Sequence, residues 1–229
     1  SDVQLKCDLC TLDNALDNEY AQHLLEGKAL PINYNTYITQ NQAISGTNIS
    51  INVSRALSRL KTIFISFVHT RSITNSLIVK EFNNFYHPMI EKGVYDSTSE
   101  LEYQIQIGSK LYPEYPVKSL SEAFSKLKQC VYGADNTFHS ISFTAKQYRQ
   151  DSFIIGIDTE KVPGAGFTGL NTKSGDLITI KVKAQQVRGA LEPRNGAGIL
   201  SDEMPTNMFI TLFSDNIMEI RDTGVSVYD

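Results

Sequence analysis

Apolar and polar residues alternate along much of this 229-residue chain, and this period of two constrains its fold more than any other feature. Successive side chains of a strand point to opposite faces of the sheet, so strict alternation indicates a strand with one buried face. The clearest case is residues 101–107, and residues 3–9 alternate in the same way. We therefore expect a chain built mainly from half-buried strands.

Further strands are predicted wherever such alternation, or a run of β-branched and aromatic residues, lies between turn residues. They cover residues 30–39, 49–53, 62–69, 138–143, 152–158, 176–183, 208–213, 217–221 and 225–228.

Two segments follow a helical pattern instead. The first has Asp13 or Asn14 as its N-cap and Gly27 as its stop. The second begins at Ser119, which forms a capping box with Glu122, because each of these side chains can bond the backbone N–H of the other residue. We expect the second helix to cap one end of the strand assembly.

About ten strands and two helices, without regular strand–helix alternation, argue against a parallel α/β sheet. We predict an all-β fold, a jelly-roll β-sandwich of about eight main strands with two short helices and long inter-strand loops. Residues 1–229 are expected to form a single domain. The longest loops are residues 70–99 and 184–205, and loops of that length in a compact domain are usually functional or disordered.

Charge and hydropathy narrow the range of partners. The chain carries 21 basic and 25 acidic residues, a net charge of −4, which differs from the basic footprint of a nucleic-acid-binding domain. The longest strongly apolar run, residues 63–68, has six residues, whereas a membrane-spanning helix needs about 20. We expect neither sequence-specific nucleic-acid binding nor a membrane span.

The sequence predicts no catalytic, cofactor-binding or metal-binding residues, and hence no enzyme. Cys7 and Cys10 form a C-x-x-C motif, for which a zinc or redox role is the weaker interpretation because no second pair exists. We expect these two thiols and Cys130 to be unbridged and metal-free, since their spacing suits neither a four-ligand zinc site nor a disulfide on one face of a strand.

Other motifs have structural explanations that we favour. Residues 164–169 match G-x-G-x-x-G, but a strand follows them where a nucleotide-binding fold needs a helix, so the glycines are expected to allow tight turns. The asparagines of two glycosylation sequons, Asn48 and Asn52, are read as chance occurrences. The four histidines are scattered along the chain, at positions 23, 69, 87 and 139.

Two carboxylate pairs could in principle act as acid and base, namely Asp158 with Glu160 and Asp215 with Glu219. Nothing in the sequence brings either pair into a shared cleft. We therefore expect these side chains to be solvated at strand ends.

One ordered set of segments is more specific. It comprises Tyr86-His87-Pro88, residues 101–117 with the turn Gly108-Ser109-Lys110 and two prolines, residues 153–158 and 167–177, and the ending 216–225. In this order the segments, which span about two thirds of the chain, resemble the major capsid proteins of Polinton-like and adintovirus-like elements. Those proteins belong to the double jelly-roll capsid lineage of large DNA viruses.

The resemblance implies a virion protein made in the infected host cell, which assembles into trimeric, pseudo-hexameric capsomers of an icosahedral shell. It also implies a metal-free building block without catalytic residues, and minor capsid proteins as further partners. This chain departs from the family in its length. The family's proteins have two tandem jelly rolls, whereas this chain is long enough for only one. The chain thus resembles the C-terminal jelly roll, either as an isolated fragment or with a first jelly roll that precedes it.

Two alternatives stay open at this point. A jelly-roll module that binds carbohydrate or another ligand usually presents exposed aromatic platforms, and the chain has no Trp but 11 Tyr. A jelly-roll enzyme of the cupin kind needs clustered His and Glu ligands, which the sequence does not show.

Overall fold

The computed structural model describes residues 4–45, 48–68, 101–134, 143–150, 152–160, 168–173, 175, 177–184 and 207–228. They belong to two compact units. Residues 35–215 form the larger unit, called the sandwich below, and residues 4–34 with 216–228 form the terminal unit.

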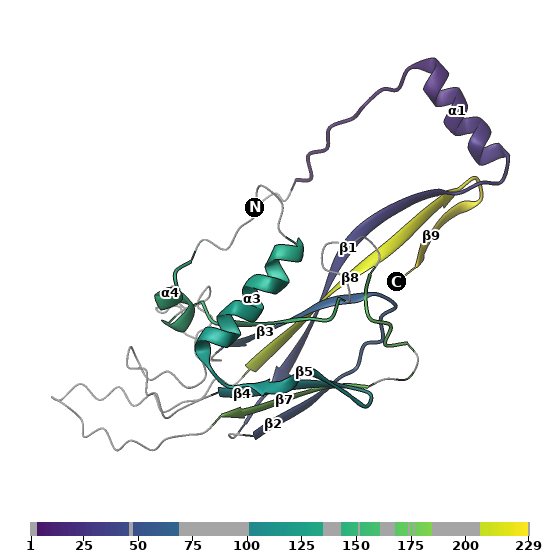
Figure 1. Cartoon of the computed structure of the whole chain (residues 1–229). Helices are drawn as coiled ribbons and strands as arrows, with labels where there is room; N and C mark the ends of the chain where they lie inside the picture. Colours follow the sequence, from purple (N-terminus) through teal and green to yellow (C-terminus); the bar gives the residue numbers. More distant parts are fainter. Residues whose placement is uncertain are drawn as a thin grey trace, which may run out of the picture. The chain divides into compact units, whose positions relative to one another are not determined.

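The elements of the described residues are labelled in Figure 1. The strands are β1 (Leu30–Ala43), β2 (Asn48–Val53), β3 (Leu60–Val68), β4 (Leu101–Ile107), β5 (Lys110–Val117), β6 (Ile154–Asp158), β7 (Ile178–Ala184), β8 (Asn207–Arg221) and β9 (Gly224–Tyr228). The helices are α1 (Asn14–Leu25), α3 (Leu120–Ala134) and α4 (Ala145–Gln150).

Eight strands form a jelly roll. One sheet has the order β1-β8-β3-β6, with β9 added to β8, and the other has the order β2-β7-β4-β5. Strand β4 pairs antiparallel with β5, β3 with β6 and β2 with β7, and β1 lies beside β8. The chain is therefore one long nested hairpin rolled into two sheets, which is the jelly-roll arrangement. This confirms the predicted fold class and the expected number of main strands.

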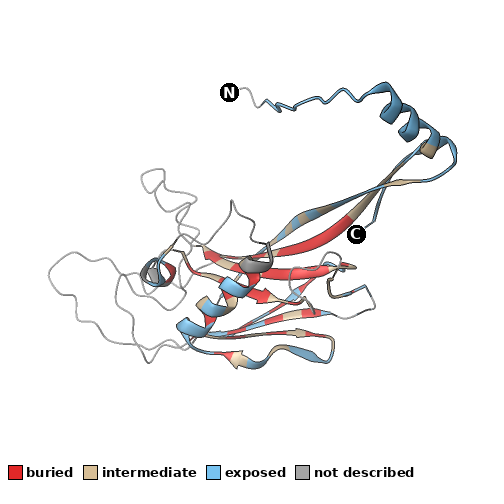
Figure 2. Ribbon diagram, turned by 45° about the horizontal axis from the view of Figure 1, so that its top comes forward, coloured by how far each residue is buried: buried red, intermediate tan, exposed pale blue. Residues whose placement is uncertain are grey.

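The core lies between the two sheets and follows the sequence alternation. In β4 the residues Leu101, Tyr103, Ile105 and Ile107 are buried and those between them are half-buried. The strands of the other sheet present Ile, Leu, Met and Phe side chains to the same core, and Figure 2 shows these buried positions along the strands. Burying one such side chain contributes about 1.5–3 kcal/mol.

The helix predicted at Ser119 is confirmed. Its first turn is capped as expected, because Glu122 donates its backbone N–H to the Ser119 Oγ over 3.2 Å. The helix packs on the side of the sandwich, against the edge strand β6, rather than across an end as we predicted. Gly156 of β6 allows this approach, since a Cβ there would lie 3.1 Å from the Leu127 Cα and 3.0 Å from the Cys130 Sγ.

The first helix is also confirmed as α1, with Asp13 as its N-cap. The Asp13 Oδ1 accepts the backbone N–H of Asn14 over 2.8 Å. The strand predicted over residues 3–9 is wrong in its described part, because residues 4–13 form no regular structure. The alternation is real, but no described strand pairs with this segment, so its apolar residues Leu5 and Leu9 are exposed.

The structure differs from the predicted secondary structure in three further places. The strands predicted over 208–213 and 217–221 are one strand, β8, and the segment that forms β5 was not predicted as a strand. Helix α4 was not predicted either. The strand predicted over 138–143 and the loops predicted over 70–99 and 184–205 lie outside the described residues, with two exceptions. Phe143 is described and is not in a strand, and Ala184 is the last residue of β7 rather than part of a loop.

Candidate association surfaces

The three thiols are free in the structure. Cys7 and Cys10 are exposed, whereas Cys130 is buried on α3. Burial, together with the nearby Asp158 carboxylate, raises the pKa of the Cys130 thiol to about 12. This thiol is therefore protonated at neutral pH and acts as a small apolar group of the core.

The carboxylates of the two acidic pairs, Asp158 with Glu160 and Asp215 with Glu219, are not grouped as the sequence suggests. The Lys61 Nζ lies 2.9 Å from the Glu160 Oε1 and 3.5 Å from the Asp215 Oδ2. This lysine thus joins one member of each pair, and the expectation that these carboxylates are solvated is wrong for both. Their side chains are 3% and 8% exposed, and that of Lys61 is 10% exposed.

The neighbouring Asp158 is partly buried. Burial raises the pKa of its carboxyl group, although the ammonium groups of Lys61 and Lys126 oppose the shift. The carboxylate accepts the backbone N–H of Glu160 over 2.8 Å. The Lys61 ammonium also lies 5.5 Å from the centre of the Phe213 ring. These contacts hold β3, β6 and β8 together, so we assign the cluster a structural role.

Gly169, the last glycine of the G-x-G-x-x-G match, serves close packing. A Cβ at this position would overlap the Cα and carbonyl carbon of Arg59. The next residue, Leu170, exchanges two backbone hydrogen bonds with Leu60, of 2.8 and 3.0 Å. Glycine is therefore needed at position 169 because the backbone there lies against the backbone of Arg59. The other two glycines of the motif lie outside the described residues.

Within the described ranges, no group of three or more His, Cys, Asp or Glu side chains could hold a metal ion. His23 lies in the last turn of α1, and the other three histidines lie outside those ranges. Both sequon asparagines are exposed on β2, where Asn52 accepts a hydrogen bond from Thr179. No described helix is long and apolar enough to span a membrane.

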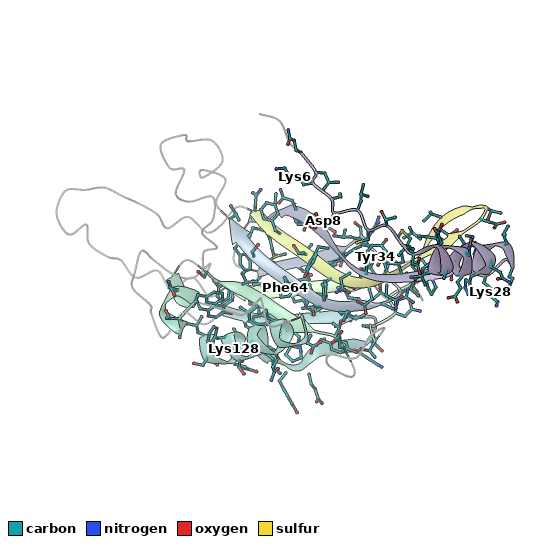
Figure 3. The ribbon with its side chains drawn as sticks, turned by 90° about the horizontal axis from the view of Figure 1, so that it is seen from above. Lys6, Asp8, Lys28, Tyr34, Phe64 and Lys128 are labelled. Carbon is teal, nitrogen blue, oxygen red and sulfur yellow. The ribbon has the colours of Figure 1, made fainter. Side chains whose placement is uncertain are left out.

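The described part of the sandwich contains an apolar hollow of about 260 Å³ outside its core. It lies between the outer face of the first sheet and helix α3. Its lining residues are Tyr37, Phe64, Ser66, Leu127, Val131, Phe143, Ile154 and Thr211. Figure 3 labels Phe64 on β3 and Lys128 on α3.

Exposed large apolar side chains are concentrated in the terminal unit. Ten of the fourteen in the described residues belong to it: Leu5, Leu9, Leu12, Leu16, Tyr20, Leu25, Ile32, Val225, Val227 and Tyr228. No residue of α1, all of which are described, is buried, as the exposed colouring in Figure 2 shows. A lone 12-residue helix is only marginally stable in water. Among the described residues, the terminal unit is therefore the part of the chain with the most exposed apolar side chains.

Charge separates the two units as well. The described residues of the terminal unit include three basic and seven acidic side chains, a net charge of −4. Over the full sequence, residues 35–215 carry 18 basic and 16 acidic side chains, a net charge of +2.

No known protein family matches the sequence, and no curated protein is similar to it in sequence. Solved structures do share the fold. A crystal structure of PBCV-1 VP54, fitted into a cryo-EM reconstruction of the virophage Sputnik, matches 94% of this chain with a TM-score of 0.52 and 12% identity. The match covers 54% of the VP54 chain, so our chain spans about half its length.

Two further structures are similar. A quasi-atomic model of the PBCV-1 capsid matches 90% of this chain and 54% of its own, with a TM-score of 0.47 and 11% identity. The cryo-EM structure of the Sputnik virophage matches 87% of this chain and 38% of its own, with a TM-score of 0.42 and 10% identity. The match to VP54 establishes that this chain has a viral capsid jelly-roll fold.

Proposed function

We propose that this chain is a structural subunit of a viral capsid in the double jelly-roll lineage. The observation that carries the proposal is the shared fold, which extends over 94% of the chain. The chain works by association and carries no catalytic step. It functions in the virion, after synthesis in the infected host cell.

The ratio of lengths supports a two-domain parent protein. Nearly all of this chain matches only 54% of VP54. One jelly roll here therefore corresponds to about half of that protein, and we propose that a first jelly roll precedes it. Three copies of the complete protein would form a pseudo-hexameric capsomer, and minor capsid proteins would join these capsomers in an icosahedral shell.

The uncovered terminal unit supports association in a different way. A specific protein interface buries about 800 Å² on each partner, which requires about 20–30 residues. The terminal unit offers 44 described residues, and Asn216 alone among them is buried. This surface is large enough for a stable contact.

Light scattering and electron microscopy of the full-length protein test the proposal. We expect trimers in solution, and shells or hexagonal arrays of trimers at higher concentration. A strictly monomeric protein that binds glycans saturably would refute the capsid function and favour a carbohydrate-binding module. The exposed ring of Tyr37 beside the apolar hollow would then be the first place to examine.

A further inference from the structure

Strand β1 has a long outer edge without the features that usually protect an edge. Of the described strands, only β8 pairs with β1, so the other side of β1 is an edge of the sheet (Figure 1). An edge offers unpaired backbone N–H and C=O groups to any extended chain, and proteins usually block it with charges, prolines or a short strand. Strand β1 has 14 residues, none of them charged, and its one proline is Pro31 near its start.

The other edge strands of the two described sheets are protected in these ways. Strand β5 contains two prolines and the charged residues Lys110 and Glu114. Strands β6 and β9 have five residues each, and helix α3 packs against β6. Strand β2 has six residues. Among the described strands, β1 therefore has the edge that is most open to pairing with another chain.

A second part of the chain has the sequence of a strand and no described partner. Residues 3–9 alternate between apolar and polar, yet residues 4–13 form no regular structure. Leu5 is 91% exposed and Leu9 is 95% exposed. Such a segment can form a strand only where a sheet edge accepts its backbone, and it gains most where its apolar side chains continue an apolar face.

Strand β1 offers both an edge and such a face. Leu30, Ile32 and Tyr34 alternate along β1, so their side chains share one face of the strand, and Ile32 is 43% exposed. A strand added at this edge with Leu5 and Leu9 on the same face would extend the apolar surface, and its polar residues would lie on the other face. Residues 4–9 include one basic and one acidic side chain, so they bring no net charge to the uncharged strand.

We propose that residues 4–9 of a second copy of this chain pair with the outer edge of β1 as an added strand. In such strand addition, backbone hydrogen bonds provide affinity and the alternating side chains provide specificity. The segment does not occupy the β1 edge of its own chain, and each copy has one segment and one edge. Donation from each copy to the next therefore satisfies all copies when the ring closes, as it does in a trimer. This inference rests on the self-association proposed above and names the residues that carry it.

The native thiols of the segment allow the contact to be trapped. Cys7 and Cys10 are exposed, and residues three apart on a strand point to opposite faces, so the added strand would present a thiol on each face. Asn35→Cys places a thiol at an exposed position of β1, and Glu114→Cys is the matched control on the protected edge of β5. After mild oxidation of the full-length proteins with copper phenanthroline, peptide mapping should find position 35 joined to Cys7 or Cys10 of another chain. The yield should be at least ten times that at position 114.

Two neighbouring substitutions test the segment itself. Leu5→Asp places a charge on its apolar face, and Gln4→Asp places the same charge on its polar face. Sedimentation should show at least tenfold weaker association for Leu5→Asp and less than a twofold change for Gln4→Asp. Both residues are exposed and lie outside regular structure, so thermal midpoints should not change.

Three results would overturn the inference: disulfides to position 35 formed only within one chain, a yield at position 35 no greater than that at position 114, or Leu5→Asp protein that associates like the wild type. Each of these leaves the capsid function standing as long as the wild-type protein forms trimers. A wild-type protein that is always monomeric would overturn both.

Discussion

Replacing Lys61 by methionine tests whether the three-residue charge cluster is structural. The substitution keeps most of the side-chain volume and removes the one ammonium group that contacts both Glu160 and Asp215. Two carboxylates that are 3% and 8% exposed would then lack their shared cation. Removing one partner of a buried ion pair costs about 3–5 kcal/mol.

This cost should lower the thermal midpoint by about 10 °C, given roughly 2–4 °C per kcal/mol for a chain of this size. Calorimetry at pH 7 measures it directly. Lys183→Met is the matched control, because it removes the same charge from an exposed pair with Glu102 at 3.6 Å. Exposed pairs contribute about 0–1 kcal/mol, so this control should remain close to the wild type. A loss below about 1 kcal/mol at pH 7 would refute the reasoning.

Three further predictions concern single sites. Ser119→Ala should lower the free energy of unfolding in urea by about 1 kcal/mol through loss of the N-cap, and an unchanged midpoint would contradict the helix start. Gly169→Ala should cost about 3 kcal/mol, because its Cβ would overlap the Arg59 backbone; near-native stability in calorimetry would argue against this contact. A thiol reagent should titrate two cysteines in the native protein and three in denaturant, since burial raises the pKa of Cys130 to about 12; three native equivalents would show that Cys130 is accessible.

The strands of the core were predictable because their burial is one-sided. Apolar and polar residues alternate over residues 101–107, and in β4 the apolar side chains are buried while those between them are half-buried. Strand β5 has no such pattern, and Pro113 and Pro116 obscure it further. Proline is tolerated there because β5 is an edge strand, where a backbone N–H need not pair. That edge position is a property of the sheet and cannot be predicted from the segment.

Helix α4 was missed although a local signal was present. Thr144 and Gln147 form a capping box, in which the Thr144 backbone N–H donates to the Gln147 Oε1 over 2.8 Å and the Gln147 N–H donates to the Thr144 Oγ1 over 3.3 Å. The six-residue helix is too short for an apolar stripe to show its period. In this case the cap was the stronger signal.

The charge cluster could not be predicted from spacing. Its members come from β3, from β8 and from just beyond β6, and only the sheet order brings them together. The irregular register between Leu60 and Thr62 also matters, because a bulge re-aims the side chain of Lys61. The alternation over residues 3–9 shows the opposite case. It identifies one apolar face, but it does not identify a surface against which that face would pack.

The nested pairing of the strands has a consequence for the order in which the sandwich folds. Ile105 and Tyr112, paired in the β4–β5 hairpin, are 7 residues apart, whereas Ile63 and Ile157 are 94 apart and Ile51 and Ile180 are 129 apart. Thr36 and Ser214, which join β1 to β8, are separated by 178 residues. Closing a loop costs more entropy as it lengthens, but each completed inner pair shortens the loop that the next pair must close. We therefore expect folding to begin at the β4–β5 turn and to proceed outward, with β1 and β8 joining last and the high contact order making the process slow.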